Sequence, residues 1–333
     1  MKSKTMIRIF SEALATESTQ VKEEGIKKLY IWAVEALQST PQNAELALHI
    51  TIQAKKLGIP FQGIDHIRAM AFFCLERWQE AFQAVKEELR WFPDNVAARE
   101  LLATIRERGW GDPDPTRRTD AFEEIYSAVY EYTMLSKARL CALHLNAESI
   151  LRSGMKGNFV ECGVAGGGSS GLLSWVLKKL AAPEVKLFCC DSFTGMPAPT
   201  EHDIHAGQDA DSTGWGTGTC AAPESSVQAI CSKVGTEDKI VIVKGYFEDT
   251  LPVWKDKIGA IAFLHMDGDW YSSTKAILDN LYDHLVPGAY VQIDDYGHWD
   301  GCRKAIHEFF DARNIALKLR QIDATGFSFT KPE

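Results

Sequence analysis

The sequence predicts an α/β fold, in which a mostly parallel sheet with helices on both faces follows an all-α domain of helical hairpins. From residue 158 onward, short continuous apolar runs alternate with helical patterns, as is typical of parallel strands buried on both faces. Residues 1 to about 110 instead show apolar positions at steps of three and four, with no strand pattern. Residues 108–120 contain two Gly and two Pro, a composition typical of linkers. We therefore place a helical domain at 1–112 and an α/β domain at 120–333.

Composition restricts the function further. The 333 residues are 45% hydrophobic and 24% charged, which suffices for a sizeable core. The formal net charge of −9, without a dense Lys/Arg cluster, argues against nucleic-acid binding. No signal peptide and no apolar run of about 18 residues is present, so we expect no membrane span and a cytoplasmic protein. The eight cysteines form no CxxC pair, which argues against zinc and predicts buried, reduced thiols.

Two stretches of the helical domain resemble each other. Residues 40–58 and 92–110 each begin with Pro-x-Asn before a helical pattern, which suits the start of a helix. Five residues between them have spacings like those of a tetratricopeptide (TPR) repeat, a two-helix unit of about 34 residues: Ala69, Phe72, Ala81, Val85 and Pro93. The Trp and Gly expected near the start of such a repeat are absent. This domain is expected to supply packing or a dimer face, and contact with a carrier or partner protein is the alternative.

The α/β domain is expected to contain seven strands, at 158–164, 185–192, 239–245, 260–267, 288–295, 316–323 and 327–331. Helices are expected from Ser169, Ser272 and Cys302. Because right-handed crossovers connect parallel strands, their carboxyl ends lie along one edge of the sheet, and open α/β sheets bind ligands there.

The first of these strands ends in a glycine-rich turn, Gly163 to Gly168, that lets the backbone approach a ligand closely. The turn lacks the GxGxxG order of a dinucleotide site and the Lys of a phosphate loop. Glu161 would repel phosphate but would favour a cationic group, and Asp191 at the end of the second strand can accept ribose hydroxyls. A nucleoside with a positive centre and no phosphate indicates S-adenosylmethionine. Alternatively, Glu161 and Asp191 are ordinary turn carboxylates.

Four aspartates follow two later strands, Asp267 and Asp269 after one, Asp294 and Asp295 after the next. If these strands are neighbours about 4.8 Å apart, the carboxylates converge. Like charges about 4 Å apart cost on the order of 4 kcal/mol at an effective dielectric of about 20, so the cluster favours a cation. Oxygen ligands suit Mg²⁺, or Mn²⁺ or Ca²⁺. We predict Asp267, Asp294 and Asp295 as ligands and Asp269 as the base, with helix-capping carboxylates as the alternative.

Six motifs between about residues 130 and 330 resemble, in order, those of the macrocin O-methyltransferase (TylF) family: YTMLSKARLCAL, GNFVECGVAGGGSS, DSFTGMPAP, VKGYFEDTLP, LHMDGDWYSST and IDDYGHWDGCRKAIHEFF. The resemblance implies a Rossmann-like class I methyltransferase fold. It also implies a metal-dependent enzyme that moves the methyl of S-adenosylmethionine to a hydroxyl of a small-molecule secondary metabolite of sugar, polyketide or peptide type. The extra helical domain, and Ala165 and Gly166 where a bulkier pair is common, depart from the family pattern.

The resemblance also implies a set of cofactor-binding residues, drawn from the motifs: Thr133, Met134, Glu161, Gly163, Ser169, Asp191, Ser192, Phe193, Phe247 and Asp267. Within this set, Glu161, Gly163 and Ser169 are expected at the methionine part, Asp191 and Ser192 at the ribose, and Phe247 at the adenine. The same metal ligands and the same base follow from it, and it favours a homo-oligomer.

Residues 199–223 form a polar, glycine-rich insertion that is too long for a simple turn. We predict a lid over the site, with His202, His205 and Trp215 near the substrate and either histidine as an alternative base to Asp269. A solvated loop is the alternative. Two other functions stay open: a metal-dependent glycosyltransferase that uses the Asp-Gly-Asp motif, and a helical partner-binding scaffold with a degenerate catalytic half. Glu161 argues against the first and the four aspartates argue against the second.

Overall fold

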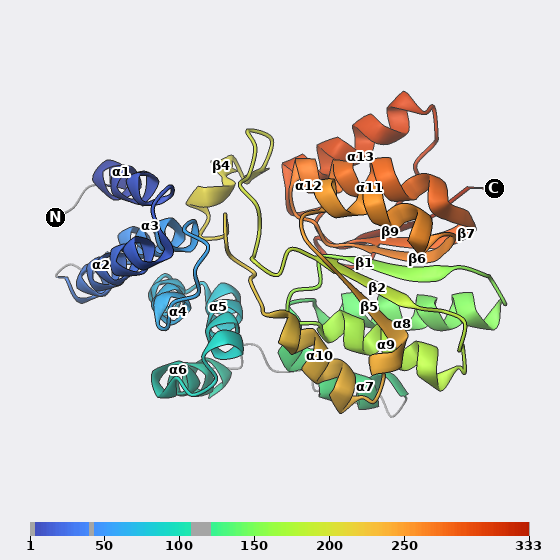
Figure 1. The fold of residues 1–333 in the computed structure, drawn as a ribbon, viewed down its shortest axis with the longest axis horizontal. Coiled ribbons are helices and arrows are strands. Elements are labelled where there is room, and N and C mark those ends of the chain that lie inside the picture. The colour runs from blue at the N-terminus through green and yellow to red at the C-terminus, as the bar shows by residue number, and fades with distance from the viewer. Residues whose placement is uncertain (1–3, 40–42, 108–120, 333) are drawn as a thin grey trace. The chain divides into compact units, whose positions relative to one another are not determined.

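The structure, a computed structural model of residues 1–333, describes residues 4–39, 43–107 and 121–332. The chain divides into two compact units (Figure 1). The helical unit comprises residues 1–113, 194–198 and 210–223, and the sheet unit comprises residues 114–193, 199–209 and 224–333. The predicted linker, residues 108–120, lies outside the described residues. The insertion that we expected to belong wholly to the α/β domain is thus shared between the two units.

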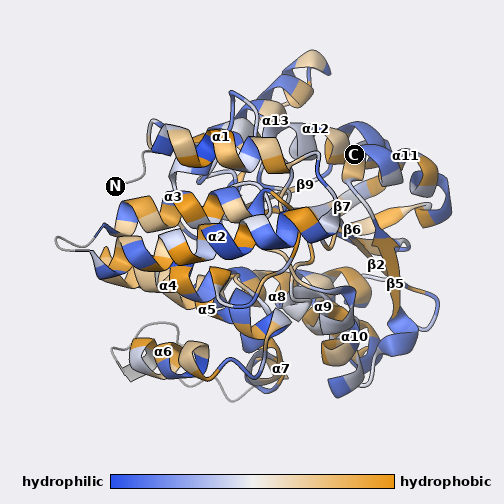
Figure 2. Cartoon of the chain, turned by 60° about the vertical axis from the view of Figure 1, so that its left-hand side comes forward, coloured by the Kyte–Doolittle hydropathy of each residue, from blue (hydrophilic) through white to orange (hydrophobic). Residues whose placement is uncertain are grey.

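The described part of the helical unit contains six α-helices: α1 (Lys4–Leu14), α2 (Thr19–Gln38), α3 (Ala44–Lys55), α4 (Ile64–Cys74), α5 (Trp78–Trp91) and α6 (Val96–Glu107). From α2 onward, each packs against the next one along the chain, as helical hairpins do. The expected helix starts are confirmed, because Asn43 Oδ1 accepts from Leu46 N (2.9 Å) before α3 and Asn95 Oδ1 accepts from Ala98 N (3.3 Å) before α6. Apolar and polar residues share each of these helices (Figure 2), as expected for amphipathic helices.

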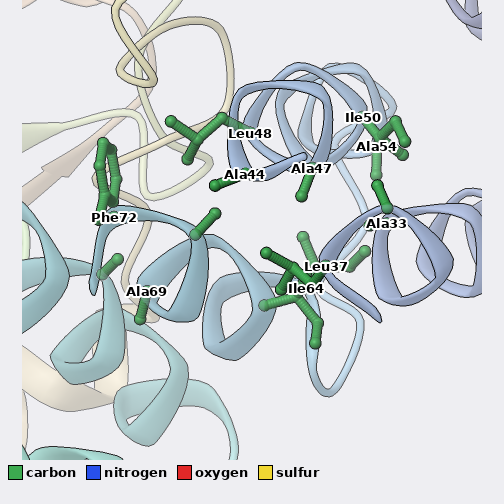
Figure 3. Close-up of a cluster of buried hydrophobic side chains, with 14 of the residues drawn as sticks. Ala33, Leu37, Ala44, Ala47, Leu48, Ile50, Ala54, Ile64, Ala69 and Phe72 are labelled. Atoms are coloured by element: carbon green, nitrogen blue, oxygen red, sulfur yellow. The ribbon is translucent and has the colours of Figure 1, made fainter. Parts of the chain in front are cut away.

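Small and branched apolar side chains fill the core of the helical unit. Leu37 of α2, Ala47 of α3 and Ile64 of α4 belong to one cluster and point into the space between these helices (Figure 3). Phe72 of α4 is fully buried in the same cluster. Of the eight cysteines, Cys74 at the end of α4 is exposed, contrary to the buried position expected for it, because the helix turns that residue away from the core.

The sheet unit contains a seven-stranded sheet in the order β5-β2-β1-β6-β7-β9-β8. Its strands are β1 (Asn158–Cys162), β2 (Leu187–Asp191), β5 (Ile240–Lys244), β6 (Ile261–Met266), β7 (Leu285–Ile293), β8 (Arg320–Gln321) and β9 (Phe327–Thr330). The first five are mutually parallel, and β9 and β8 add an antiparallel edge. The predicted mostly parallel sheet of seven strands is confirmed, although β8 is much shorter than expected.

Helices cover both faces of this sheet (Figure 1). One face carries α11 (Phe247–Ile258), α12 (Tyr271–Leu281) and α13 (Asp300–Ala312). The other carries α7 (Ala121–Val129), α8 (Lys137–Arg152), α9 (Gly168–Lys179) and α10 (Glu224–Lys233). The short 3₁₀ segments are Tyr130–Tyr132, Ala210–Ser212, Glu237–Lys239 and Tyr282–His284, and the insertion contains a small hairpin, β3 (Ile204–His205) and β4 (Gln208–Asp209). Among the described residues, no helix is long and apolar enough to cross a membrane.

Candidate active site

The chain reverses its direction across the sheet at β1. The next strand of the sheet along the chain, β2, pairs with β1 on one side. A later strand, β6, pairs with β1 on the other side. Gly163 follows β1 with a φ of 92°, and a Cβ built on it would overlap the carbonyl oxygen of Asp267. Gly163 is therefore required for the close packing of two strand ends, besides any approach to a ligand. This switch point is where open α/β sheets bind ligands.

Glu161 lies beneath the glycine-rich turn with its side chain fully buried. Ser170 of α9 donates its hydroxyl to Glu161 Oε2, and Glu161 Oε1 lies 3.0 Å from His265 Nδ1. The parallel register places Glu161 opposite His265 on the neighbouring strand β6. Both carboxylate oxygens of Glu161 therefore have protein partners, and its predicted contact with the methionine part would use a remaining acceptor position.

Asp191, at the end of β2, organises the turn after β1. Its Oδ2 accepts from the backbone N–H groups of Val164 (2.7 Å) and Ala165 (3.0 Å), and its Oδ1 accepts from Phe193 N (2.7 Å). Burial raises the pKa of Asp191, although these three donors favour its charged form. A carboxylate has about four acceptor positions, so one is left for a ribose hydroxyl.

The other predicted cofactor residues surround the same switch point. Thr133 is buried, accepts from Leu135 N (3.1 Å) and lies against Gly168 at the start of α9, where Ser169 is buried too. Phe247, the first residue of α11, faces Gly268, which follows β6. Met134 and Ser192 are half-buried beside Thr133 and Phe193 along the chain.

The four aspartates converge as the sequence predicted. The strands β6 and β7 are neighbours, and the N–H of Asp294 donates to Met266 O (2.9 Å). Carboxylate oxygens of Asp267, Asp269 and Asp295 lie within 4.8 Å of one another, and so do ligand atoms of Asp267, Asp294 and His265. The structure therefore divides the predicted ligands Asp267, Asp294 and Asp295 between two groups that share Asp267.

This crowding of carboxylates changes their acidity. Burial, followed by the charges of Asp294 and Asp295, raises the pKa of Asp267 well above its usual range, and burial with Asp269 and Asp294 does the same for Asp295. Burial raises the pKa of Asp269 to about 7. The hydrogen bond that Trp299 Nε1 donates to its Oδ1 (3.1 Å) acts in the opposite direction and lowers this pKa. Without a cation, each of these three carboxyl groups is therefore harder to ionise than a solvent-exposed aspartate.

Two fixed side chains supply part of the missing positive charge. Arg139 of α8 forms an ion pair with Asp294 Oδ2 and another with Asp323 Oδ2 (3.0 Å). His265 Nε2 lies 3.8 Å from Asp294 Oδ1, and neither atom has a hydrogen-bond partner among the described residues. Burial opposes the charged form of His265, but Asp294 and Glu161 outweigh it and raise its pKa to about 9.

Of the two predicted alternative bases, His205 contacts the tryptophan that donates to Asp269. Its Nδ1 is 2.8 Å from His298 O, its ring stacks on that of His298 at 4.0 Å, and it meets Trp299, the partner of Asp269, at 5.7 Å. His202 instead packs edge-on against Tyr271 and lies 3.1 Å from Lys304 Nζ. No contact of His202 with the four aspartates is found in the part of the chain that the structure describes.

Four residues of this site had no role in the sequence-based prediction: Arg139, Asp203, His265 and Trp299. His265 precedes Met266 by one residue, and it could have been found by placing β6 beside β1, since the register then sets it opposite Glu161. Asp203 is buried and accepts from Tyr271 N (2.7 Å), the first residue of α12. No local sequence signal indicates that contact, because 68 positions separate its partners.

Comparison with known proteins identifies the family. The model of the family described as Macrocin-O-methyltransferase (TylF) matches residues 74–331. The chain belongs to the TylF family. The match begins at Cys74 and so includes α5 and α6, whereas the motifs had indicated a start near residue 130. The enzyme is an S-adenosylmethionine-dependent O-methyltransferase, and the curated relatives that it matches are named O-methyltransferases.

Two curated relatives match the same share of the chain. The 8-demethyl-8-(2,3-dimethoxy-alpha-L-rhamnosyl)-tetracenomycin-C 4'-O-methyltransferase of Streptomyces olivaceus is 36% identical over 196 residues, 59% of this chain and 74% of that protein. The demethyldecarbamoylnovobiocin O-methyltransferase of Streptomyces niveus is 32% identical over 59% of this chain and 74% of its own. The solved O-methyltransferase NovP superposes with a TM-score of 0.56 at 29% identity, covering 69% of this chain and 94% of its own. The predicted methyltransferase fold is confirmed.

Proposed function

We propose that this enzyme transfers the methyl group of S-adenosylmethionine to a sugar hydroxyl of a glycosylated secondary metabolite, in a reaction that requires a divalent cation. The observation that carries the cation requirement is the convergence of Asp267, Asp269, Asp294 and Asp295 at one sheet edge. The tetracenomycin relative is named for a substrate that carries a rhamnosyl group, which supports a sugar as the acceptor.

The residues at the sheet edge fit a hard cation. Asp294 Oδ1 is buried without a hydrogen-bond partner, and Asp267 and Asp295 have pKa values raised by burial and by their neighbours. A divalent cation would relieve both conditions, and its preference for oxygen favours the carboxylates over His265. Asp267, Asp294 and Asp295 are the proposed ligands.

The turn after β1 and its surroundings fit the nucleoside. Asp191 holds the turn after β1 through the N–H groups of Val164 and Ala165, Thr133 lies against Gly168, and Phe247 lies against Gly268. An open α/β sheet binds its ligand at this edge, which supports a nucleoside there. Glu161 contributes a buried negative charge beneath this turn, which favours a cationic cofactor over a phosphate. We assign the cofactor to this edge, with Asp191 and Ser192 on the ribose side.

Asp269 is the proposed base. When bound, the cofactor supplies an electrophilic methyl group and the cation lowers the pKa of the acceptor hydroxyl. Asp269 takes the proton of that hydroxyl at a carboxylate oxygen, and Trp299 Nε1 holds the other oxygen in place at 3.1 Å. Bound beside the acceptor, S-adenosylmethionine would supply the methyl group to the deprotonated oxygen, and its sulfur would leave with the electron pair of the carbon–sulfur bond. His205, whose ring contacts that of Trp299, and His202 are the alternative bases.

Removal of divalent cations is expected to abolish methyl transfer without abolishing cofactor binding. We expect a chelator to reduce the turnover of an aryl rhamnoside by about a hundredfold or more, and added Mg²⁺ to restore it. Mass spectrometry of the acceptor measures the gain of one methyl group, and calorimetry measures binding of S-adenosylmethionine with and without Mg²⁺. Full turnover in the presence of chelator would contradict the cation requirement.

The same calorimetry tests the glycosyltransferase alternative, which membership of the TylF family disfavours. We expect S-adenosylmethionine to bind and a nucleotide sugar not to bind, with or without Mg²⁺. Binding of the nucleotide sugar only with Mg²⁺, and no binding of S-adenosylmethionine, would overturn the assignment of Glu161 and Asp191.

A further inference from the structure

The insertion between β2 and α10 has two parts that pack in different places. Residues 194–198 and 210–223, which we call the anchor segments, belong to the helical unit. Residues 199–209, which we call the tip, belong to the sheet unit. The anchor segments are joined to each other, because Met196 N donates to Thr219 O (2.9 Å) and Gly218 N donates to Met196 O (2.9 Å). The anchor segment before the tip is therefore hydrogen-bonded to the anchor segment after it.

Glu87 of α5 is one of the polar contacts of the anchor segments, besides Trp91 Nε1, which donates to Ala221 O (3.1 Å), and the ion pair of Lys56 with Asp211. Its side chain is fully buried, and it accepts from the backbone N–H groups of Ala221 (2.9 Å) and Cys220 (3.1 Å). The same carboxylate pairs with Lys55 Nζ (2.8 Å) and Arg68 Nη2 (2.6 Å). Burial opposes ionisation of Glu87, but these two cations outweigh it and lower its pKa to about 2. A permanently charged, buried acceptor thus holds the end of the insertion.

Aromatic packing holds the middle of the longer anchor segment. Trp215 stacks on Phe72 of α4 with 5.8 Å between ring centroids, and the guanidinium of Arg68 lies 4.9 Å from the centre of the Trp215 ring. A Cβ on Gly214 would collide with Phe72, and one on Gly218 would collide with the backbone of Lys55. Trp215, which we had expected near the substrate, is therefore part of the helical unit's packing.

The tip makes its own specific contacts in the sheet unit. Asp203, which is buried, accepts from Tyr271 N (2.7 Å) at the start of α12 and from Thr200 N (2.6 Å). His205 stacks on His298, which precedes the Trp299 that donates to Asp269. The tip thus packs on the two segments that carry the proposed base and its hydrogen-bond donor.

We propose that Glu87 is a positioning residue for methyl transfer: it fixes the anchor segments and so fixes both ends of the tip that packs beside Asp269. The inference rests on the proposed function for its kinetic consequence. A tip with fixed ends loses less conformational entropy when the acceptor binds than one with free ends. The anchor segments therefore affect acceptor binding through the tip whose ends they hold, whereas cofactor binding depends on residues of the sheet unit.

The test compares Glu87→Gln with Glu88→Gln. Glu88 is the next residue of α5 and is equally buried, but its partners, Gly63 N (2.8 Å) and Asn95 Nδ2 (2.7 Å), lie just before α4 and α6 and not in the insertion. Both substitutions keep the side-chain shape and remove a buried acceptor charge, so both are expected to lower the stability of the helical unit. Only Glu87→Gln removes the charged acceptor of the anchor segments.

We expect Glu87→Gln to raise the KM for an aryl rhamnoside by about tenfold, with the Kd of S-adenosylmethionine changed less than about twofold. Hydrogen exchange of residues 199–209 should become faster, and the fluorescence of Trp215 should shift as its ring leaves Phe72. Glu88→Gln should leave KM and the exchange of the tip as in the wild type. If Glu87→Gln does not fold, Trp215→Leu loosens the same anchor while it leaves the ion pairs of Glu87 in place, and the same changes of KM and tip exchange are expected.

Two results would overturn the proposal: an unchanged KM and tip exchange in a folded Glu87→Gln or Trp215→Leu protein, or equal changes of both in the Glu88→Gln control. Failure of the proposed function itself has a different signature. In that case no variant, including the wild type, methylates the rhamnoside, while exchange of the tip still reports whether Glu87 holds it.

Discussion

Replacing Asp267 with Asn is expected to lower kcat for methyl transfer by about a thousandfold, yet to leave the metal-free protein at least as stable as the wild type. Asp267 is the one carboxylate shared by both groups of ligand atoms at the sheet edge. Its loss therefore weakens every arrangement of a cation there. The amide retains a single neutral oxygen, which Mg²⁺ binds more weakly than a carboxylate.

The stability expectation follows from the charges around Asp267. Burial and the neighbouring Asp294, Asp295 and Asp269 all raise its pKa, and Arg139 only partly offsets them. A group in that setting costs free energy when ionised in the folded protein, and an Asn of the same shape removes this cost. The same substitution should thus separate catalysis from folding.

The measurement is kcat with saturating Mg²⁺, together with urea unfolding of the chelator-treated protein. Asp256→Asn, at an exposed position on α11, is the control and should change neither quantity. A loss of unfolding free energy above about 2 kcal/mol in metal-free Asp267→Asn would mean that the carboxylate is structural. Retained turnover would remove Asp267 from the ligand set.

The sequence predicted the sheet edge because its signals are local. Apolar runs followed by Asp or Gly mark strand ends, and parallel strands bring those ends together, so the convergence of Asp267 and Asp295 needed only the adjacency of β6 and β7. Glu161 and Asp191 were found in the same way, as carboxylates at the ends of β1 and β2.

What the sequence did not reveal depends on long-range packing. Arg139 contacts Asp294 from α8, 155 positions away, and Glu87 contacts Ala221 across 134 positions. Neither contact leaves a periodicity or a short spacing in the sequence from which it could be predicted. The insertion was predicted as a lid because of its polar composition, but composition cannot distinguish a lid from a segment whose two ends pack in another unit.

Stability of the metal-free enzyme is expected to fall by about 3 kcal/mol between pH 6.5 and about pH 9, because of His265. The pKa of this histidine is 6.5 in the unfolded chain and about 9 in the folded protein, where burial is outweighed by Asp294 and Glu161. A raised pKa means that the folded state holds the proton more tightly. The contribution is therefore complete below pH 6.5 and is lost as the pH rises through 9.

Unfolding free energies of the chelator-treated wild type and of His265→Asn, measured by urea titration across this pH range, test the expectation. The variant should lack the part of the slope due to His265, while any slope that remains reports the aspartates, whose raised pKa values act in the same direction. His307→Asn, which alters an exposed histidine of α13, should keep the wild-type slope. Equal slopes for the wild type and His265→Asn would mean that His265 is neutral in the fold, and that Arg139 alone supplies the fixed positive charge beside Asp294.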